Sequence, residues 1–85
     1  MAKFKIEIKK SAVREIKKLP PVYFKRNILK IDELTDNPRS KKCIKLTNEE
    51  KYIIRMWRYR ILYEIIDKKL TVIVLKIGHS KDVYS

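Results

Sequence analysis

Residues 70 to 75 form the most apolar stretch of the chain, and this stretch limits the possible folds more than any other feature. Leu70-Thr71-Val72-Ile73-Val74-Leu75 would place apolar side chains on both faces of an extended strand. A strand of this kind is typical of the centre of a sheet covered on both faces. The stretch is far shorter than the roughly 20 residues of a membrane-spanning helix. We therefore predict a central strand from Leu70 to Ile77 and no membrane segment.

Three further strands are predicted between residues 43 and 66, directly before the central one. Cys43 to Leu46 is a short strand, and Lys51 to Met56 with Tyr59 to Ile66 form a hairpin. The polar turn Asp67-Lys68-Lys69 leads into the central strand. Because these strands follow one another through short turns, we expect them to pair antiparallel.

The first 38 residues predict one strand and two helices. Lys3 to Lys9 alternates between apolar and charged residues, as a half-buried strand does. Ser11 is the expected N-cap of the first helix, and Pro20-Pro21 ends this helix and opens the second. Asn37-Pro38 ends the second helix. The expected apolar stripes of the two helices are Ala12, Val13, Ile16 and Leu19, and then Phe24, Ile28, Ile31 and Leu34.

The predicted fold is a single α+β domain spanning residues 1–85, with the order β-α-α-β-β-β-β. It has an antiparallel twisted sheet with the N-terminal αα-hairpin packed on one face. Cys43 is the only cysteine, so no disulfide framework is expected, and a reducing, cytoplasmic location follows.

The chain is strongly basic. It has 22 Lys and Arg residues against 10 Asp and Glu residues, a formal net charge of +12. Self-repulsion on this scale opposes a compact fold, so the excess charge is expected to bind a polyanion. Nucleic acid is the first candidate, because binding to it releases counterions from the phosphates. An acidic protein or an anionic membrane would use the same charge.

Arg55 and Arg60 are expected to face each other across the predicted hairpin. If the chain turns at residues 57 and 58, Arg55 lies opposite Arg60 on the same face. Like charges in directly opposed positions are unfavourable, so the pair implies a buried acid or an external anion between them. Glu64 shares the face of Arg60, and a solvated or Glu64-paired couple is the structural alternative.

Gly78, His79 and Tyr84 form a second cluster. Gly78, the only glycine, favours a backbone turn that a side chain would obstruct. His79 titrates near neutral pH and is a candidate acid, base or phosphate ligand. Alternatively His79 is a surface or hydrogen-bonded residue, and Tyr84 packs at the C-terminus. One histidine and Cys43 do not make a metal site, so no metal or cofactor is expected.

Most of the aromatic residues near the arginine pair are expected to lie in the core. The alternation places Tyr52, Met56, Tyr59 and Tyr63 on the face opposite Arg55 and Arg60. Trp57, at the turn, is the one candidate for stacking on a base.

A set of short motifs follows the chain in a fixed order. The helical pair has a Lys18-Leu19-Pro20 junction and a Leu34-Thr35-Asp36-Asn37-Pro38 end, and the Lys45-Leu46 strand follows. The later motifs are Arg55-x-x-x-Tyr59-Arg60-Ile61-Leu62-Tyr63-Glu64-Ile65, Gly78-His79 and Tyr84. Together they cover nearly the whole chain and resemble the RelE/ParE superfamily of toxin–antitoxin toxins.

The RelE-like resemblance implies a ribosome-dependent endoribonuclease that cuts mRNA without a metal. In that family the ribose 2′-OH attacks the adjacent phosphate, and basic side chains stabilise the developing charge. Arg60 matches the phosphate-stabilising arginine, Arg55 a basic residue of the preceding strand, and Tyr84 the terminal tyrosine. His79 is the candidate acid or base. The expected RNA-binding residues are Lys45, Lys51, Trp57, Arg58 and Lys81.

The chain departs from the family pattern at several positions. Ser80 stands where many RelE-type toxins have an arginine, and Ile53 occupies a position that is basic in relatives. Trp57 and Arg58 replace a glycine-containing turn. The alternative is a ParE-like gyrase inhibitor, or a catalytically weakened toxin that acts as a binding module. A different basic nucleic-acid or ribosome binder is a third possibility.

The resemblance also implies partners. A cognate antitoxin, small and acidic, is expected to form a toxin–antitoxin hetero-oligomer with this chain, and the ribosome and mRNA are the expected targets.

Overall fold

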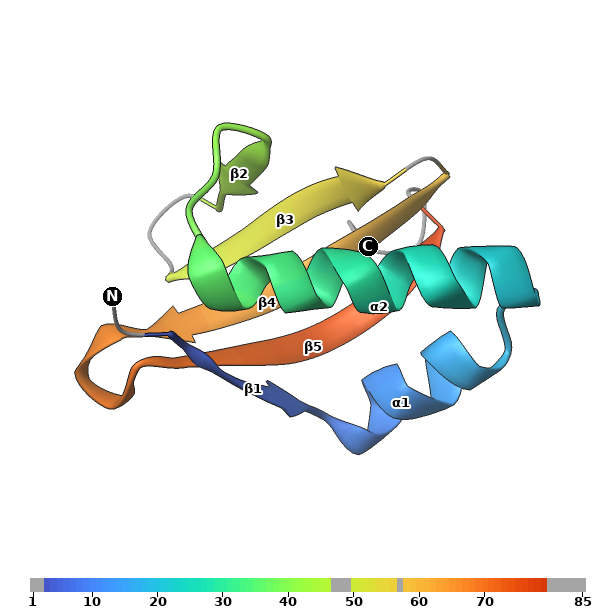
Figure 1. Cartoon of the computed structure of the whole chain (residues 1–85), viewed down its shortest axis with the longest axis horizontal. Coiled ribbons are helices and arrows are strands. Elements are labelled where there is room, and N and C mark those ends of the chain that lie inside the picture. Colours follow the sequence, from blue (N-terminus) through green and yellow to red (C-terminus); the bar gives the residue numbers. More distant parts are fainter. Residues whose placement is uncertain (1–2, 47–49, 57, 80–85) are drawn as a thin grey trace.

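The computed structural model describes residues 3–46, 50–56 and 58–79, and only the backbone of His79. Two helices lie against a five-stranded sheet (Figure 1). The elements are β1 (Lys5–Ile8), α1 (Lys10–Lys17), α2 (Pro21–Asp36), β2 (Cys43–Lys45), β3 (Lys51–Met56), β4 (Tyr59–Ile66) and β5 (Thr71–His79). The order β-α-α-β-β-β-β and the α+β class are therefore confirmed. No helix in these residues is long and apolar enough to cross a membrane.

The strands are arranged in the order β1-β5-β4-β3-β2. Strands β2 to β5 pair antiparallel with their neighbours in the chain, as expected. The sheet is nevertheless mixed, because β1 pairs parallel with β5. No tight turn joins β1 to β5, so no hairpin sets their relative direction. The predicted central strand, β5, is an interior strand between β1 and β4, and β4 is the central strand of the sheet.

A register shift in β5 explains its unbroken apolar run. Leu62 pairs with Lys76 and Tyr63 pairs with Val74, so Leu75 has no partner on β4. Such a bulge breaks the alternation of a strand and lets side chains separated by an odd number of residues share one face. Two-sided cover was the wrong explanation of the run, because the core lies on one face and Ile73 stays only half-buried.

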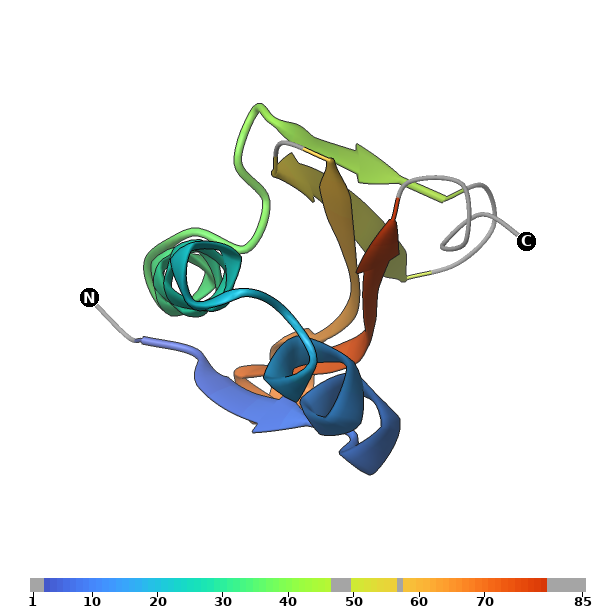
Figure 2. The same ribbon diagram turned by 90° about the vertical axis from the view of Figure 1, so that its right-hand side faces the viewer.

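Both helices contribute to one core on the same face of the sheet. The sheet curves around α2 (Figure 2), and α1 packs mainly on β5. The predicted stripe of α2 is rotated by about one residue: Phe24 and Ile28 are 37% and 40% exposed, whereas Asn27 is fully buried. The buried Asn27 donates a hydrogen bond from Nδ2 to Tyr23 O at 2.8 Å, within the same helix, while its Oδ1 has no hydrogen-bond partner among the described residues. The buried helix residues of the core cluster are Ala12, Ile16, Ile31 and Leu34.

The start of α1 differs from the prediction. The helix begins at Lys10 with Lys9 as its N-cap, and no side chain caps it, so Ser11 is not the cap. Because β1 pairs with β5 only as far as Val74, the later part of β5 lacks a strand on that side. Further along β5, the side chain of Glu15 from α1 takes the place of a neighbouring strand as a hydrogen-bond acceptor. Its Oε1 accepts a hydrogen bond from Ile77 N at 3.4 Å.

Candidate functional site

Arg55 and Arg60 face each other at the end of the β3–β4 hairpin. The register pairs Arg55 with Arg60 and Met56 with Tyr59, which confirms the predicted hairpin. Arg55 is exposed and Arg60 half-buried, with its Nε shielded from solvent. Ile54 and Ile61, their neighbours in sequence, are in the core, so the two arginines lie on the face away from the helices. The arginine pair therefore belongs to the outer face of the sheet, where Arg55 is accessible to a ligand.

Gly78 occupies the position next to Arg60 on β5. It lies within the strand and has no positive φ, so the predicted turn at this glycine is wrong. The glycine instead leaves the position without a Cβ, and the backbone is accessible beside the arginine pair. Arg55, Arg60 and Gly78 therefore form one row across three strands of the outer face. We call it the arginine row.

An apolar row runs beside the arginine row. Ile44 pairs with Ile53, and Ile53 pairs with Leu62. Ile44 is 58% exposed, while Ile53 is only 2% exposed although it is not in the helix-side core cluster. A site between apolar side chains and fixed cations has a lower effective dielectric than bulk water, which strengthens binding to an anion.

The other predicted site residues lie at varied distances from the arginine row. Lys51 pairs with Glu64 at the far end of the hairpin, four residues from Arg55 or about 13 Å along the strand. Lys45 is on β2, and its Nζ lies 3.5 Å from Glu50 Oε1. Arg58 is exposed in the hairpin turn.

The C-terminal candidates are only partly described. The backbone of His79 pairs with Tyr59, one position beyond the arginine row. Trp57, Ser80, Lys81 and Tyr84 lie outside the described residues. In the part of the chain that the structure describes, no group of three His, Cys, Asp or Glu side chains could hold a metal ion.

The predicted aromatic core is confirmed. Tyr52 and Tyr63 are buried with their rings stacked 5.8 Å apart, and Met56 is 8% exposed. Tyr59 contacts Tyr23 of α2, with ring centroids 5.2 Å apart. These side chains are structural and leave the outer face to the arginines.

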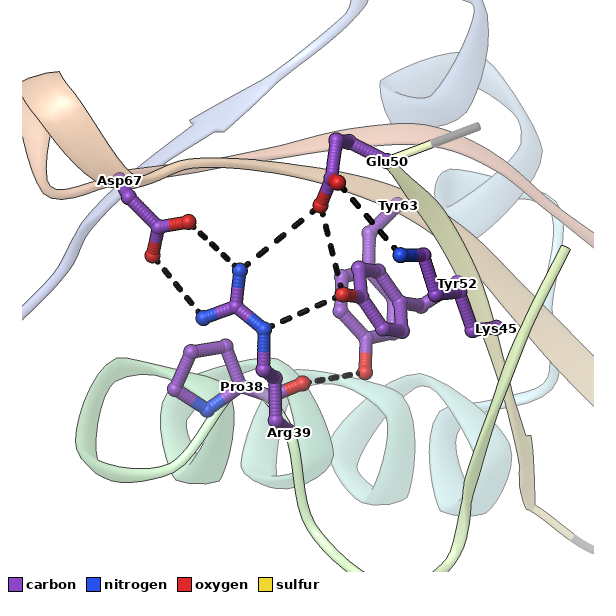
Figure 3. Close-up of polar contacts among 7 residues, drawn as sticks. All are labelled: Pro38, Arg39, Lys45, Glu50, Tyr52, Tyr63 and Asp67. Carbon is purple, nitrogen blue, oxygen red and sulfur yellow. Dashed lines mark hydrogen bonds and ion pairs between the residues drawn. The ribbon is translucent and has the colours of Figure 1, made fainter. Parts of the chain in front are cut away.

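An arginine that sequence analysis did not single out organises the opposite end of the sheet. Arg39 donates two hydrogen bonds to the Asp67 carboxylate, at 2.9 and 2.7 Å, and a third to Tyr52 Oη at 3.1 Å (Figure 3). Its guanidinium also lies over the Tyr52 ring, 5.6 Å from the centroid. Glu50 Oε2 is 3.9 Å from the Arg39 Nη2 atom. Arg39 thus connects the segment after α2 to β3 and to the β4–β5 turn.

Tyr63 holds the same segment from inside the core. Its Oη donates a 2.6 Å hydrogen bond to Pro38 O (Figure 3). Burial raises the pKa of the Tyr63 phenol above its ordinary value of 10, so the group remains a donor at neutral pH. Pro38 and Arg39 are therefore anchored on both sides, and this anchor carries the chain from α2 to the edge strand β2.

Replacing Asp67 with asparagine is expected to make stability less dependent on acid pH. The hydrogen bonds from Arg39 lower the pKa of Asp67 below its ordinary 3.8. The ionised carboxylate therefore stabilises the folded chain above pH 3.8, and this contribution is lost as pH falls through the lowered pKa. Urea unfolding at pH 7 and pH 2 should show a deficit of the variant at pH 7 that becomes smaller at pH 2.

The matched control is Asp32→Asn, because Asp32 is exposed on α2 and makes none of the ion pairs found among the described residues. A pH dependence that is equal for the two variants would show that the Arg39–Asp67 contact adds nothing to stability.

The family comparison assigns the chain to a class of protein, the toxins of type II toxin–antitoxin systems. The chain belongs to the family described as "ParE toxin of type II toxin-antitoxin system, parDE", whose model matches residues 6–84. A Methanocaldococcus jannaschii protein named "Putative toxin RelE1" is 28% identical over 86 residues, with 96% of each chain covered. Within the superfamily, the chain is therefore similar to the RelE-like toxins.

Solved structures of RelE toxins have the same fold. A chain of the Mycobacterium tuberculosis RelBE2 toxin–antitoxin complex superposes with a TM-score of 0.81 at 26% identity, over 91% of this chain and 98% of that one. A double arginine-to-alanine mutant of Escherichia coli RelE in the free state gives a TM-score of 0.81 at 29% identity, over 99% of this chain and 92% of that one. A chain of the RelB–RelE complex from Methanococcus jannaschii gives 0.74 at 25% identity, over 93% and 95%.

Proposed function

We propose that this toxin is a ribosome-dependent endoribonuclease that cuts mRNA and so inhibits translation. The observation that carries the proposal is the arginine row, with two opposed cations and a glycine on the outer face of the sheet. Opposed cations on a rigid hairpin are pre-oriented for the extra negative charge of a phosphate under attack. The similarity to RelE toxins supports the same activity.

The proposed reaction is a metal-independent transfer within the RNA strand. The ribose 2′-oxygen bonds to the adjacent phosphorus, the bond from phosphorus to the 5′-oxygen breaks, and a proton passes from the 2′-hydroxyl to that leaving oxygen. Arg60 stabilises the pentavalent phosphate and Arg55 assists it. His79 is proposed as the acid or base that compensates for Ser80, and Tyr84 orients the nucleophile or stacks on a base.

Further contacts and partners complete the proposal. Lys45, Lys51, Trp57, Arg58 and Lys81 are proposed to bind RNA around the site. The RelBE complexes contain an antitoxin beside the toxin, which supports a cognate, small and acidic antitoxin for this chain and a hetero-oligomer with it. The proposed location is the cytoplasm, where ribosomes and mRNA are found.

One observation favours a second candidate, a ParE-like gyrase inhibitor or a catalytically weakened toxin. Ile53, at a position that is basic in relatives, is buried beside Leu62 and adds no cation to the outer face. The matching family model is also described as a ParE toxin.

Mapping of mRNA 5′ ends after induced expression tests the two candidates. The endoribonuclease is expected to produce new 5′ ends within translated transcripts, and blocking initiation should remove them. Intact transcripts together with gyrase-linked DNA breaks would instead establish the ParE-like function.

A further inference from the structure

α1 carries a stripe of basic side chains that is separate from the arginine row. Lys10, Arg14 and Lys17 are spaced by four and three residues, so they lie on one face of the helix. All three are exposed, whereas Ala12 and Ile16 on the other face are buried in the core. We call these three basic residues the α1 stripe. Because α1 packs on the core side of β5, the α1 stripe and the arginine row lie on opposite sides of the sheet.

The charge of the α1 stripe is not neutralised by the residues that the structure describes. In those residues the basic partners of ion pairs are Lys3, Lys30, Arg39 and Lys45, and none belongs to α1. The one acidic residue of α1, Glu15, is only half-exposed and bonds to Ile77 N of β5. The charged side chains that are exposed on α1 are therefore all cationic.

This arrangement opposes the folding of the isolated chain. Lys10 and Arg14 are like charges at a spacing of four residues, which destabilises a helix. The first turn of α1 contains no acidic residue, and Lys10 adds a positive charge at the positive end of the helix dipole. A bound polyanion would relieve both effects.

We propose that the α1 stripe binds the backbone phosphates of a structured RNA. The inference rests on the proposed function, which takes RNA as the target, and adds a second contact surface to it. Seven residues of helix rise about 10 Å, a length comparable to a few consecutive phosphates along one strand of a duplex. The geometry thus allows each cation to meet one phosphate.

An RNA backbone fits this surface better than an acidic protein does. Protein interfaces bury apolar and aromatic side chains at their centre. Among the described residues, the large apolar side chains that are exposed lie on α2, on β2 and at Leu70, and none lies on α1. Phosphates need only charge and hydrogen-bond donors, which the stripe supplies.

The test measures how a 20-base-pair RNA duplex binds to the full chain between 50 and 200 mM salt. In the variant Lys10→Gln/Arg14→Gln/Lys17→Gln, the slope of log K against log salt should fall by about 2.7, since each phosphate contact contributes about 0.9. Over this salt range the difference amounts to about 40-fold in affinity. The control Lys42→Gln/Lys68→Gln/Lys69→Gln removes the same charge from exposed positions in other elements and should change the slope by less than about 1.

Equal slopes for the two variants would overturn the inference, since general attraction would then explain the binding. Unchanged RNA binding of the stripe variant, with weaker binding to an acidic protein, would overturn it as well. If the triple variant unfolds, Arg14→Gln alone should lower the slope by about 0.9. Absence of mRNA cleavage by the wild type would refute the proposed function, while the duplex assay would still decide the role of the stripe.

Discussion

Replacing Arg60 with alanine is expected to lower ribosome-dependent mRNA cleavage by about 100-fold to 1,000-fold, the usual cost of removing one transition-state stabiliser. Arg60 is the more enclosed arginine of the arginine row, and it stands beside Gly78. Its side chain is on the outer face, so the free energy of unfolding should fall by about 1 kcal/mol or less. Single-turnover cleavage on programmed ribosomes, with urea unfolding in parallel, measures both quantities.

Two comparison variants test whether the loss of cleavage is specific to the Arg60 side chain. Lys68→Ala removes an equal charge from the exposed β4–β5 turn and should leave cleavage within about twofold of the wild type, as for a surface substitution. Arg60→Lys retains the charge but not the planar fork and should recover only part of the rate. If Arg60→Ala and Lys68→Ala cleave equally well, Arg60 does not stabilise the reacting phosphate.

Replacing Tyr63 with alanine should have the largest effect on stability, about 3–5 kcal/mol, as for other large core side chains. Tyr63 is fully buried, stacks on Tyr52 and donates to Pro38 O at 2.6 Å. Small domains have a total stability of about 5–15 kcal/mol, so the loss would unfold a sizeable fraction of the protein. Urea unfolding at neutral pH measures this loss in the free energy of unfolding.

Tyr63→Phe separates the hydrogen bond from the packing. The ring is retained, and only the bond to Pro38 O is removed, so we expect a loss of about 1–2 kcal/mol. A loss as large as that of Tyr63→Ala would contradict this division and assign most of the stability to the anchored segment after α2. A phenylalanine variant as stable as the wild type would show that the anchor contributes nothing.

The sequence predicted the hairpin and the arginine pair because alternation in β3 and β4 is regular. Once Met56 is placed opposite Tyr59, Arg55 must meet Arg60. The predicted turn at Gly78 was wrong because the missing side chain leaves space beside Arg60 within a strand and not in a turn. Both roles have the same sequence signal.

The anchor around Arg39 could not be predicted from the sequence. Arg39 and Asp67 are 28 residues apart, and they meet only because the segment after α2 passes the β4–β5 turn. No periodic pattern in the sequence indicates that these two segments are neighbours in space. The rotation of α2 was hidden for a similar reason, since a polar Asn27 is buried with a hydrogen bond inside its own helix.

The bulge at Leu75 sets the phase of everything that follows it in β5. If Leu75 paired with Leu62 in a regular ladder, with Tyr63 still opposite Val74, Arg60 would face Ile77 and Ile61 would face Lys76. A lysine would then point into the core, and a branched side chain would fill the space beside the arginine pair. One unpaired residue thus keeps the core apolar and leaves Gly78, rather than a branched side chain, beside Arg60.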